Sequence, residues 1–231
     1  MALESIMDMS DNPTAASTEI LSSSSISLDT VQSIEKNSIA ETTTTTPTQE
    51  TKSRRANITC VSQPKMFESS FIKLEYSIHV SPKRMTRELF TVFPGKDLAN
   101  LLVVPTFQKC GNQMVAWDAA IAKEKDDRLE DFVKWSTILH DRLEALGFWS
   151  DMTDPASGFP NYTERGRDIY PDVEGCHMLL KYDFQAAGCC KILLHPNWGS
   201  KVYPATFFTT APLDVLQNIL EQVQQEYPPK E

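Results

Sequence analysis

The sequence predicts an α+β fold, in which helices pack on an antiparallel sheet. Three observations support this prediction. Apolar stretches with strand-like alternation follow one another through short turns, one long segment has helical periodicity, and a second amphipathic segment closes the chain. Strands in sequential hairpins form antiparallel sheets, and amphipathic helices bury their apolar stripe against such a sheet.

The composition is that of a soluble globular protein. Of the 231 residues, 41% are hydrophobic and 23% are charged. The formal net charge of −9 argues against a nucleic-acid surface, which requires clustered basic residues. No apolar run approaches the roughly 18 residues of a membrane span. Five cysteines without disulfide-framework spacing, and no secretory signal peptide, predict reduced thiols in an intracellular protein.

Two parts differ in composition. Residues 1–57 are rich in serine and threonine and are expected to be disordered, because they cannot bury enough apolar surface to offset the entropy of ordering. Residues 58–231 are expected to form one globular domain. Acidic residues from Glu4 onward precede the first basic residue, Lys36, whereas mitochondrial presequences are rich in arginine and poor in acids. We therefore expect a cytoplasmic location.

The first half of the domain predicts two strands and a short helix. Residues 71–80 alternate apolar and polar side chains with the period of a half-buried strand. Their polar members, including Ser77 and His79, are expected to face outward. A short helix is predicted at residues 86–93, and a second apolar strand at residues 98–107.

The long helix is the clearest element. We predict that it begins at Asp127, an N-cap that Glu130 can complete as a capping box. Gly147 supplies the left-handed residue that commonly ends a helix. His140 has no second ligand one turn away, which favours a surface histidine over a metal ligand. Apolar residues recur on one face of this segment: Leu129, Phe132, Val133, Leu139, Leu143 and Leu146.

Two carboxylates follow the long helix. Asp151 and Asp154 suggest paired general acid–base chemistry, but turn and capping roles are the commoner use of such residues and are favoured here. Residues 161–176 contain many turn-forming residues and predict no defined element. A strand is then predicted at residues 178–184.

The last part of the domain is built around a cysteine pair. Residues 188–195 predict a strand, and residues 201–209 predict its hairpin partner. Residues 212–225 predict an amphipathic helix that closes the chain. The two vicinal cysteines, Cys189 and Cys190, lie at the start of the predicted strand and are the candidates for chemistry.

Strand alternation distinguishes the two thiols, because successive side chains point to opposite faces. Cys190 shares its face with Ile192 and Leu194, so we expect it in the core. The other, mixed face is expected to be accessible and carries Cys189, Lys191, Leu193 and His195. Gly188 has no Cβ and lets a bulky group approach the backbone. Cys190→Ser should therefore destabilise the domain, whereas Cys189→Ser should not.

The residues alone leave several roles open for the cysteines. The favoured one is burial of both, since unpaired cysteine is among the most buried residue types. A redox dithiol is disfavoured because a vicinal disulfide lacks the Cys-X-X-Cys geometry. A zinc site is also disfavoured, because adjacent ligands do not supply the usual gap of about two to four residues. Its candidate ligands would be Cys176, His177, Cys189, Cys190 and His195. Cys60 and Cys110 have no companions and receive no role.

Four motifs in order resemble a known family. They are Met114-Val115-Ala116-Trp117, residues 147–158 with Gly-Phe-Trp-Ser-Asp, residues 188–199 with Gly-Cys-Cys-Lys-Ile and Trp-Gly, and residues 207–212 with Phe-Phe-Thr-Thr-Ala-Pro. Together they resemble the C-terminal domain of the cblD-type cobalamin trafficking proteins (methylmalonic aciduria and homocystinuria type D). The resemblance covers roughly residues 66 to 222.

The resemblance implies a fold and a role for Cys189. The fold would be a reduced nitroreductase-like fold that has lost flavin, and no Gly-rich phosphate loop is visible in the sequence. Cys189 would bind the cobalt of a cobalamin held by a cblC-type processing partner. Thiolate is a soft donor, and the ammonium group of Lys191 would favour the deprotonated form.

The implied function is that of a non-catalytic adaptor. It would direct cobalamin towards methionine synthase or methylmalonyl-CoA mutase, and the family occurs in mitochondria as well as in the cytosol. Two alternatives from other classes remain, a flavin-dependent nitroreductase-like reductase and a zinc-stabilised interaction module. A flavin spectrum or a metal analysis of the purified protein distinguishes them.

Overall fold

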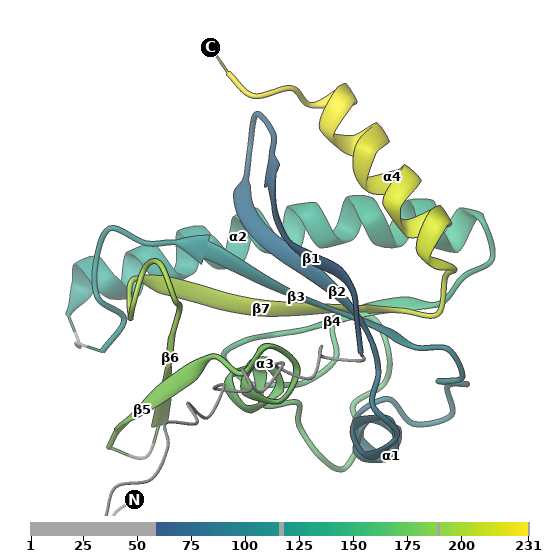
Figure 1. The fold of residues 1–231 in the computed structure, drawn as a ribbon, viewed down its shortest axis with the longest axis horizontal. Coiled ribbons are helices and arrows are strands. Elements are labelled where there is room, and N and C mark those ends of the chain that lie inside the picture. Colours follow the sequence, from purple (N-terminus) through teal and green to yellow (C-terminus); the bar gives the residue numbers. More distant parts are fainter. Residues whose placement is uncertain (1–58, 116–117, 189, 231) are drawn as a thin grey trace, which may run out of the picture. The chain divides into compact units, whose positions relative to one another are not determined.

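The structure is a computed structural model that describes residues 59–115, 118–188 and 190–230 (Figure 1). The expected disorder of residues 1–57 concerns a segment outside the described residues. In chain order the elements are β1 (Cys60–Glu68), β2 (Lys73–Val80), α1 (Lys83–Val92), β3 (Leu102–Lys109), α2 (Ala119–Ala145), β4 (Ser150–Thr153), α3 (Asp172–Leu180), β5 (Asp183–Ala187), β6 (Cys190–Leu194), β7 (Val202–Thr209) and α4 (Leu213–Glu226).

The strands form two antiparallel sheets, which confirms the α+β class and the antiparallel pairing. The larger sheet has the order β1-β2-β3-β7-β4, and β5 and β6 form a separate two-stranded sheet. Strand β7 pairs with β3 through Val104 and Phe207 and with β4 through Met152 and the same Phe207. Both neighbours of β7 come from earlier parts of the chain, so this strand completes the sheet.

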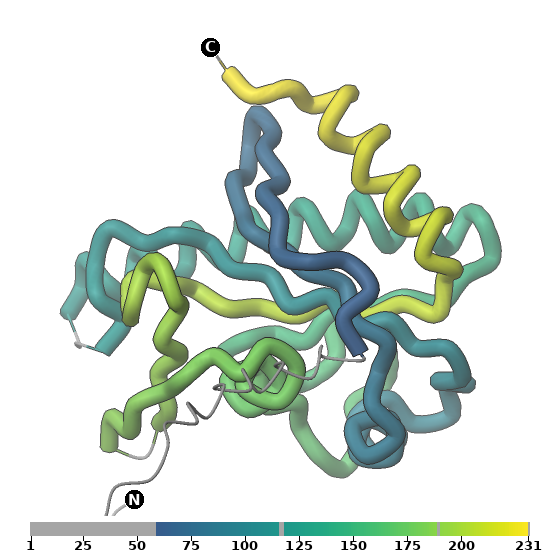
Figure 2. Tube along the Cα trace, in the orientation of Figure 1, coloured from purple at the N-terminus to yellow at the C-terminus, as the bar shows by residue number. Residues whose placement is uncertain are grey.

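Helices cover both faces of the larger sheet. Helices α2 and α4 lie on one side, and α1 and α3 lie on the other (Figure 1, Figure 2). The first side is strongly apolar, with the rings of Trp135 in α2 and Phe207 in β7 at a centroid distance of 5.9 Å. On the second side, Leu89 of α1 and Leu179 of α3 pack with Phe208 of β7.

Covering both faces explains why one prediction about β2 was wrong. Ser77 and His79 were expected to face outward, but both side chains are fully buried. Ser77 Oγ lies 2.9 Å from His79 Nε2, and burial lowers the pKa of His79 to about 4, so the ring is neutral at physiological pH. Alternation of polar and apolar residues indicated a solvated face, whereas these polar side chains are buried within the domain.

The long helix begins earlier than predicted. Helix α2 starts at Ala119, and its N-cap is Asp118, whose carboxylate accepts hydrogen bonds from two backbone amides of the first turn at 2.7 and 3.0 Å. Asp127 instead lies within the helix and pairs with Lys123 one turn before it. The turns before Asp127 bury one apolar residue, Ile121, so no apolar stripe indicated them.

The end of α2 is where the sequence indicated. Gly147 has φ +81°, its amide donates to the carbonyl of Glu144, and the next amide, of Phe148, donates to Leu143. Leu146, which was expected on the buried face, is the C-cap residue and is 59% exposed. The helix therefore ends with a left-handed glycine, as predicted, but its last apolar residue lies outside the core.

Three elements were not predicted at all. Strand β1 lies before residues 71–80, the first strand that was predicted, and β4 has only four residues. Helix α3 occupies the segment thought to be turns, and its last turn includes Met178, which was assigned to a strand. Lys181 ends this helix with φ +61° and lets β5 begin at Asp183. Short elements with polar faces carry too few residues to show a period.

The predicted partner of the cysteine strand was also wrong. Strand β6 pairs with β5, through Phe184 and Leu193, whereas β7 enters the larger sheet. A tight turn separates β6 from β7, in which the amides and carbonyls of His195 and Gly199 bond reciprocally at 2.8 and 2.9 Å. Because β7 is apolar on both faces, it suits the covered interior of the larger sheet. The other predicted elements, α1, β3 and α4, are confirmed with shifted ends.

Candidate functional site

Cys190, the second residue of the cysteine pair, lies at the tip of the β5–β6 hairpin. Ala187 at the end of β5 pairs with Cys190 at the start of β6. Gly188 adopts φ +63°, a conformation that favours glycine, and a Cβ built there would meet no atom within 4 Å. Cys189 lies outside the described residues, so its predicted role as ligand stays a prediction. The space beside its neighbour Gly188 is open, as the sequence suggested.

The face assignment for the second thiol was wrong. Cys190 is exposed, and Ile192 and Leu194 on its face are half-buried. The buried residues belong to the other face, where Leu193 is 1% and His195 2% exposed. Both faces of this short strand carry apolar residues, so alternation could not show which one is buried.

The buried face of β6 packs on the main body of the domain. Leu193 lies in a cluster with Phe107 of β3, Cys176 of α3 and Val202 of β7. Burial raises the pKa of the Cys176 thiol well above its usual value, and the nearby Asp172 raises it further. Cys176 is therefore a neutral core residue, unsuited to act as a thiolate ligand.

Lys191 carries the positive charge closest in sequence to the cysteine pair. Its ammonium group lies 2.6 Å from Glu174 Oε1 in α3 and 5.1 Å from the ring centroid of Phe184 in β5. The ion pair is half-exposed, so solvent screens it. Glu174 thus offsets part of the charge that was expected to favour a thiolate nearby.

The base of the hairpin is more polar and better buried than its tip. His195 Nε2 lies 3.0 Å from Glu75 Oε1 in β2, and the amide of Asn197 donates to His195 Nδ1 at 3.3 Å. The ring stacks on Trp198 with centroids 4.1 Å apart. Sequence reasoning placed His195 on an accessible face and missed Glu75, because the two residues are 120 positions apart.

The residues proposed for zinc do not converge. His177 Nδ1 donates to the carbonyl of Tyr182 at 2.7 Å, Cys176 is in the core, and both ring nitrogens of His195 are hydrogen-bonded. In the described parts of the chain, no three side chains of the His, Cys, Asp and Glu types gather as a metal site. Cys189, the remaining candidate ligand, lies outside those parts.

The two carboxylates after α2 have structural roles, as favoured from the sequence. The Asp151 carboxylate is fully buried and accepts four backbone N–H groups at 2.8–3.1 Å. Asp154 accepts the amides of Ala156 and Ser157 and the Ser157 hydroxyl. With its acceptor sites occupied by the backbone, Asp151 holds the chain between β4 and α3 in place. His140, predicted to be a surface residue, is half-buried, with Nδ1 3.1 Å from the Ser150 carbonyl.

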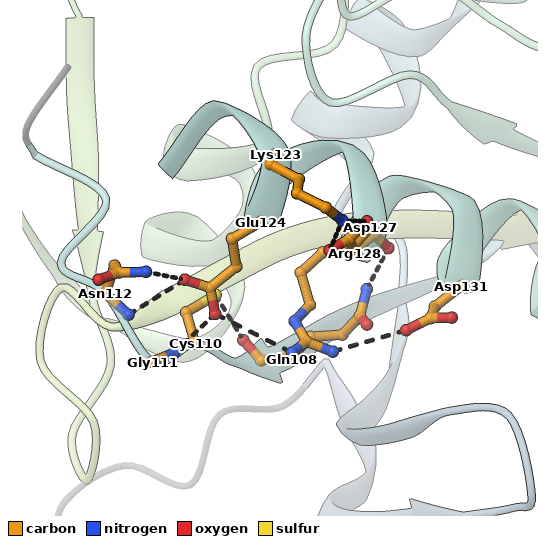
Figure 3. Close-up of polar contacts among 9 residues, drawn as sticks. All are labelled: Gln108, Cys110, Gly111, Asn112, Lys123, Glu124, Asp127, Arg128 and Asp131. Carbon is orange, nitrogen blue, oxygen red and sulfur yellow. Dashed lines mark hydrogen bonds and ion pairs between the residues drawn. The ribbon is translucent and has the colours of Figure 1, made fainter. Parts of the chain in front are cut away.

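A second polar cluster holds the loop that precedes α2 (Figure 3). The Glu124 carboxylate accepts the amides of Gly111 and Asn112 at 2.6 and 3.1 Å. Cys110 is buried beside it, and burial, with a smaller effect of the Glu124 charge, raises the pKa of this thiol to about 11. The loop leads into the Met114 motif, of which residues 116–117 lie outside the described residues. Cys110 is thus a core thiol without ligand character.

A buried carboxyl group also lies beneath the larger sheet. Asp172, in the first turn of α3, is 7% exposed and accepts a 2.5 Å hydrogen bond from the Thr206 hydroxyl of β7. Burial raises its pKa to about 7; Thr206 opposes this shift, and the charges of Asp154 and Glu174 add to it. No sequence signal indicated this contact, because α3 itself was missed.

The fold and the hairpin define the class of the protein. It is an α+β protein that carries an exposed cysteine, Cys190, at the tip of a hairpin. No helix in the described ranges has the length and apolarity to cross a bilayer. The sequence profile of the methylmalonic aciduria and homocystinuria type D protein family matches residues 5–224. Because the match covers most of the chain, the chain belongs to this family.

Curated relatives extend this result. The proteins named cobalamin trafficking protein CblD from Mus musculus and Homo sapiens are 28% and 27% identical over 148 residues, which is 64% of this chain and 49% of each relative. The Gallus gallus protein of the same name is 25% identical over 142 residues, 62% of this chain and 48% of the relative. The chain thus spans about half the length of the curated relatives it matches. The family match also begins well before residue 66, where the resemblance was thought to start.

Proposed function

We propose that this chain is a non-catalytic adaptor in the intracellular handling of cobalamin. Membership of the type D family, over residues 5–224, is the observation that carries the proposal. The names of the relatives describe cobalamin trafficking in mouse and human. In this role cobalamin is cargo that passes through the protein, and it is not a resident cofactor.

The chemical step in this proposal is coordination of cobalt by the Cys189 thiolate. Thiolate is a soft donor suited to a soft transition-metal site. The core thiols are less suitable for this role, because burial raises the pKa of Cys110 and Cys176. The open space beside Gly188 is compatible with the approach of a large planar ring.

The partners follow from the same reasoning. A cblC-type processing protein would hold the corrinoid, and this chain would accept it and direct it to methionine synthase or methylmalonyl-CoA mutase. The proposed scaffold is the reduced nitroreductase-like fold without flavin, and the proposed location is the cytoplasm, with mitochondria as the family's second compartment.

A visible spectrum tests the proposal. The purified chain is mixed with a cobalamin-loaded cblC-type partner, and the corrinoid bands are followed during titration. The wild-type chain should give a thiolate-type spectrum, and Cys189→Ser should lose it, because a neutral hydroxyl cannot replace a thiolate. The matched control is Cys190→Ser, which changes the adjacent exposed thiol and should keep the spectrum.

Other outcomes contradict the proposal. A thiolate-type spectrum that survives Cys189→Ser excludes this residue as the ligand. A yellow preparation with a flavin spectrum favours a nitroreductase-like enzyme, and one equivalent of zinc in the purified chain favours a zinc-stabilised interaction module. Import of a fluorescent fusion of residues 1–60 into mitochondria contradicts the cytoplasmic location.

A further inference from the structure

The two ends of the β5–β6 hairpin meet at one carboxylate of the larger sheet. Tyr182 precedes β5 and His195 follows β6, so they flank the last paired residues of the hairpin. The Tyr182 hydroxyl donates to Glu75 Oε1 at 3.4 Å, and His195 Nε2 lies 3.0 Å from the same oxygen. A single side chain of β2 therefore contacts both ends of the hairpin.

The histidine at this junction has one defined arrangement. Since the amide of Asn197 donates to Nδ1, this nitrogen is the acceptor and Nε2 is the nitrogen that donates to Glu75. Trp198 stacks on one side of the ring, and the rings of Phe107 and Tyr182 lie at centroid distances of 5.4 and 5.2 Å. With 2% exposure, His195 cannot turn without breaking these contacts.

The rest of the hairpin has weaker connections. Most residues of β5 and the first residues of β6 are exposed. The ion pair of Lys191 with Glu174 is half-exposed, and such pairs contribute little. Leu193 supplies apolar contact from one face, but apolar contact is not directional. The direction of the hairpin is therefore determined mainly at its base.

We propose that Glu75 is a positioning residue for the hairpin. Through Tyr182 and His195 it orients β5 and β6, the two strands that flank position 189 in the sequence. The proposal extends the proposed function, because positioning matters only if Cys189 meets a ligand. Glu75 acts through other residues and does not itself contact the cargo.

The first test needs no cobalamin. Hydrogen exchange of the hairpin amides, residues 183–194, is compared in the wild-type chain and in Glu75→Ala. Loss of two hydrogen bonds to a charged acceptor should speed exchange there by about tenfold or more. Glu75→Gln keeps an acceptor oxygen and should restore most of the protection. Glu68→Ala removes a carboxylate from an exposed ion pair in β1 and should leave the hairpin unchanged.

The second test measures the proposed function. The partner concentration needed for half of the thiolate-type spectral change should rise by about tenfold in Glu75→Ala, return towards wild type in Glu75→Gln and stay unchanged in Glu68→Ala. If Glu75→Ala does not fold, Tyr182→Phe, which removes one hydroxyl, should show the same changes at smaller size in both tests.

The outcomes separate the two proposals. Wild-type exchange in folded Glu75→Ala overturns the positioning role whatever cobalamin does. Faster exchange with an unchanged titration, while Cys189→Ser loses the spectrum, also overturns it, because the hairpin then need not be oriented for binding. If Cys189→Ser keeps the spectrum, the proposed function fails, and the exchange experiment alone supports or overturns the role of Glu75.

Discussion

Two of the described thiols, those of Cys176 and Cys190, differ in how far they are buried. Cys176 has no exposed surface and lies among apolar side chains of α3, β3, β6 and β7, whereas Cys190 is exposed at the tip of the hairpin. The same side chain is therefore a small apolar core group in one position and a surface group in the other.

This contrast predicts opposite results for the same substitution. Cys176→Ser should lower the free energy of unfolding by about 1–3 kcal/mol, because the hydroxyl is buried among apolar groups. Cys190→Ser should change it by less than about 0.5 kcal/mol. Urea unfolding of both variants checks the prediction. Equal losses would show that the hairpin tip is as well packed as the core, contrary to the structure.

The role of a single residue could be predicted where its partners lie close to it in the sequence. The capping roles of Asp151 and Asp154 involve backbone within about a dozen positions, and turn chemistry predicted them. The contact of Glu75 with His195 joins residues 120 positions apart, and no local sequence pattern predicts such a contact. The face of Cys190 could not be predicted, since both faces of β6 carry apolar residues.

Elements with a long apolar stripe were predicted, and those without one were missed. The core-facing part of α2 and the whole of α4 bury residues at helical spacing. The first two turns of α2, by contrast, bury only Ile121, and α3 has nine residues with little amphipathic character. Hydrophobic periodicity indicates contact with a core, so it fails where an element touches the core only briefly.

The true start of α2 can be tested by removing its cap. Asp118→Ala deletes the acceptor for two backbone amides and should lower the free energy of unfolding by about 0.5–2 kcal/mol. Asp127→Ala, at the start predicted from the sequence, breaks one exposed ion pair and should cost less than about 0.5 kcal/mol. Thermal or urea unfolding measures the loss of stability in each of the two variants. A larger loss for Asp127→Ala would place the effective helix start there instead.

At the scale of the whole domain, the two faces of the larger sheet differ in chemistry. The face under α2 and α4 is apolar, whereas the face under α1 and α3 buries polar groups such as His79, Thr206 and Asp172. Buried groups that titrate make the stability of the whole domain depend on pH. The class of fold followed from the sequence, but this asymmetry did not, because it arises from which helices cover which face.

Asp172 makes this dependence measurable. Its pKa is raised from an ordinary value of 3.8 to about 7, chiefly by burial. Between these values the folded protein holds a proton that the unfolded chain has lost. The stabilisation that protonated Asp172 contributes to the folded domain is therefore fully present below about pH 4. It is lost as the pH rises to about 7, so the free energy of unfolding should fall over this range.

Replacing the titrating group isolates its contribution from that of other carboxylates. Asp172→Asn is neutral at every pH and keeps an oxygen to accept from Thr206. Relative to wild type, it should gain on the order of a few kcal/mol in free energy of unfolding from pH 4 to pH 8. The control is Asp168→Asn, which neutralises an exposed carboxylate nearby and should show no such gain. Urea unfolding across this pH range decides the matter. A constant difference between Asp172→Asn and wild type would mean that Asp172 keeps its ordinary pKa in the folded protein, despite its burial beneath the sheet.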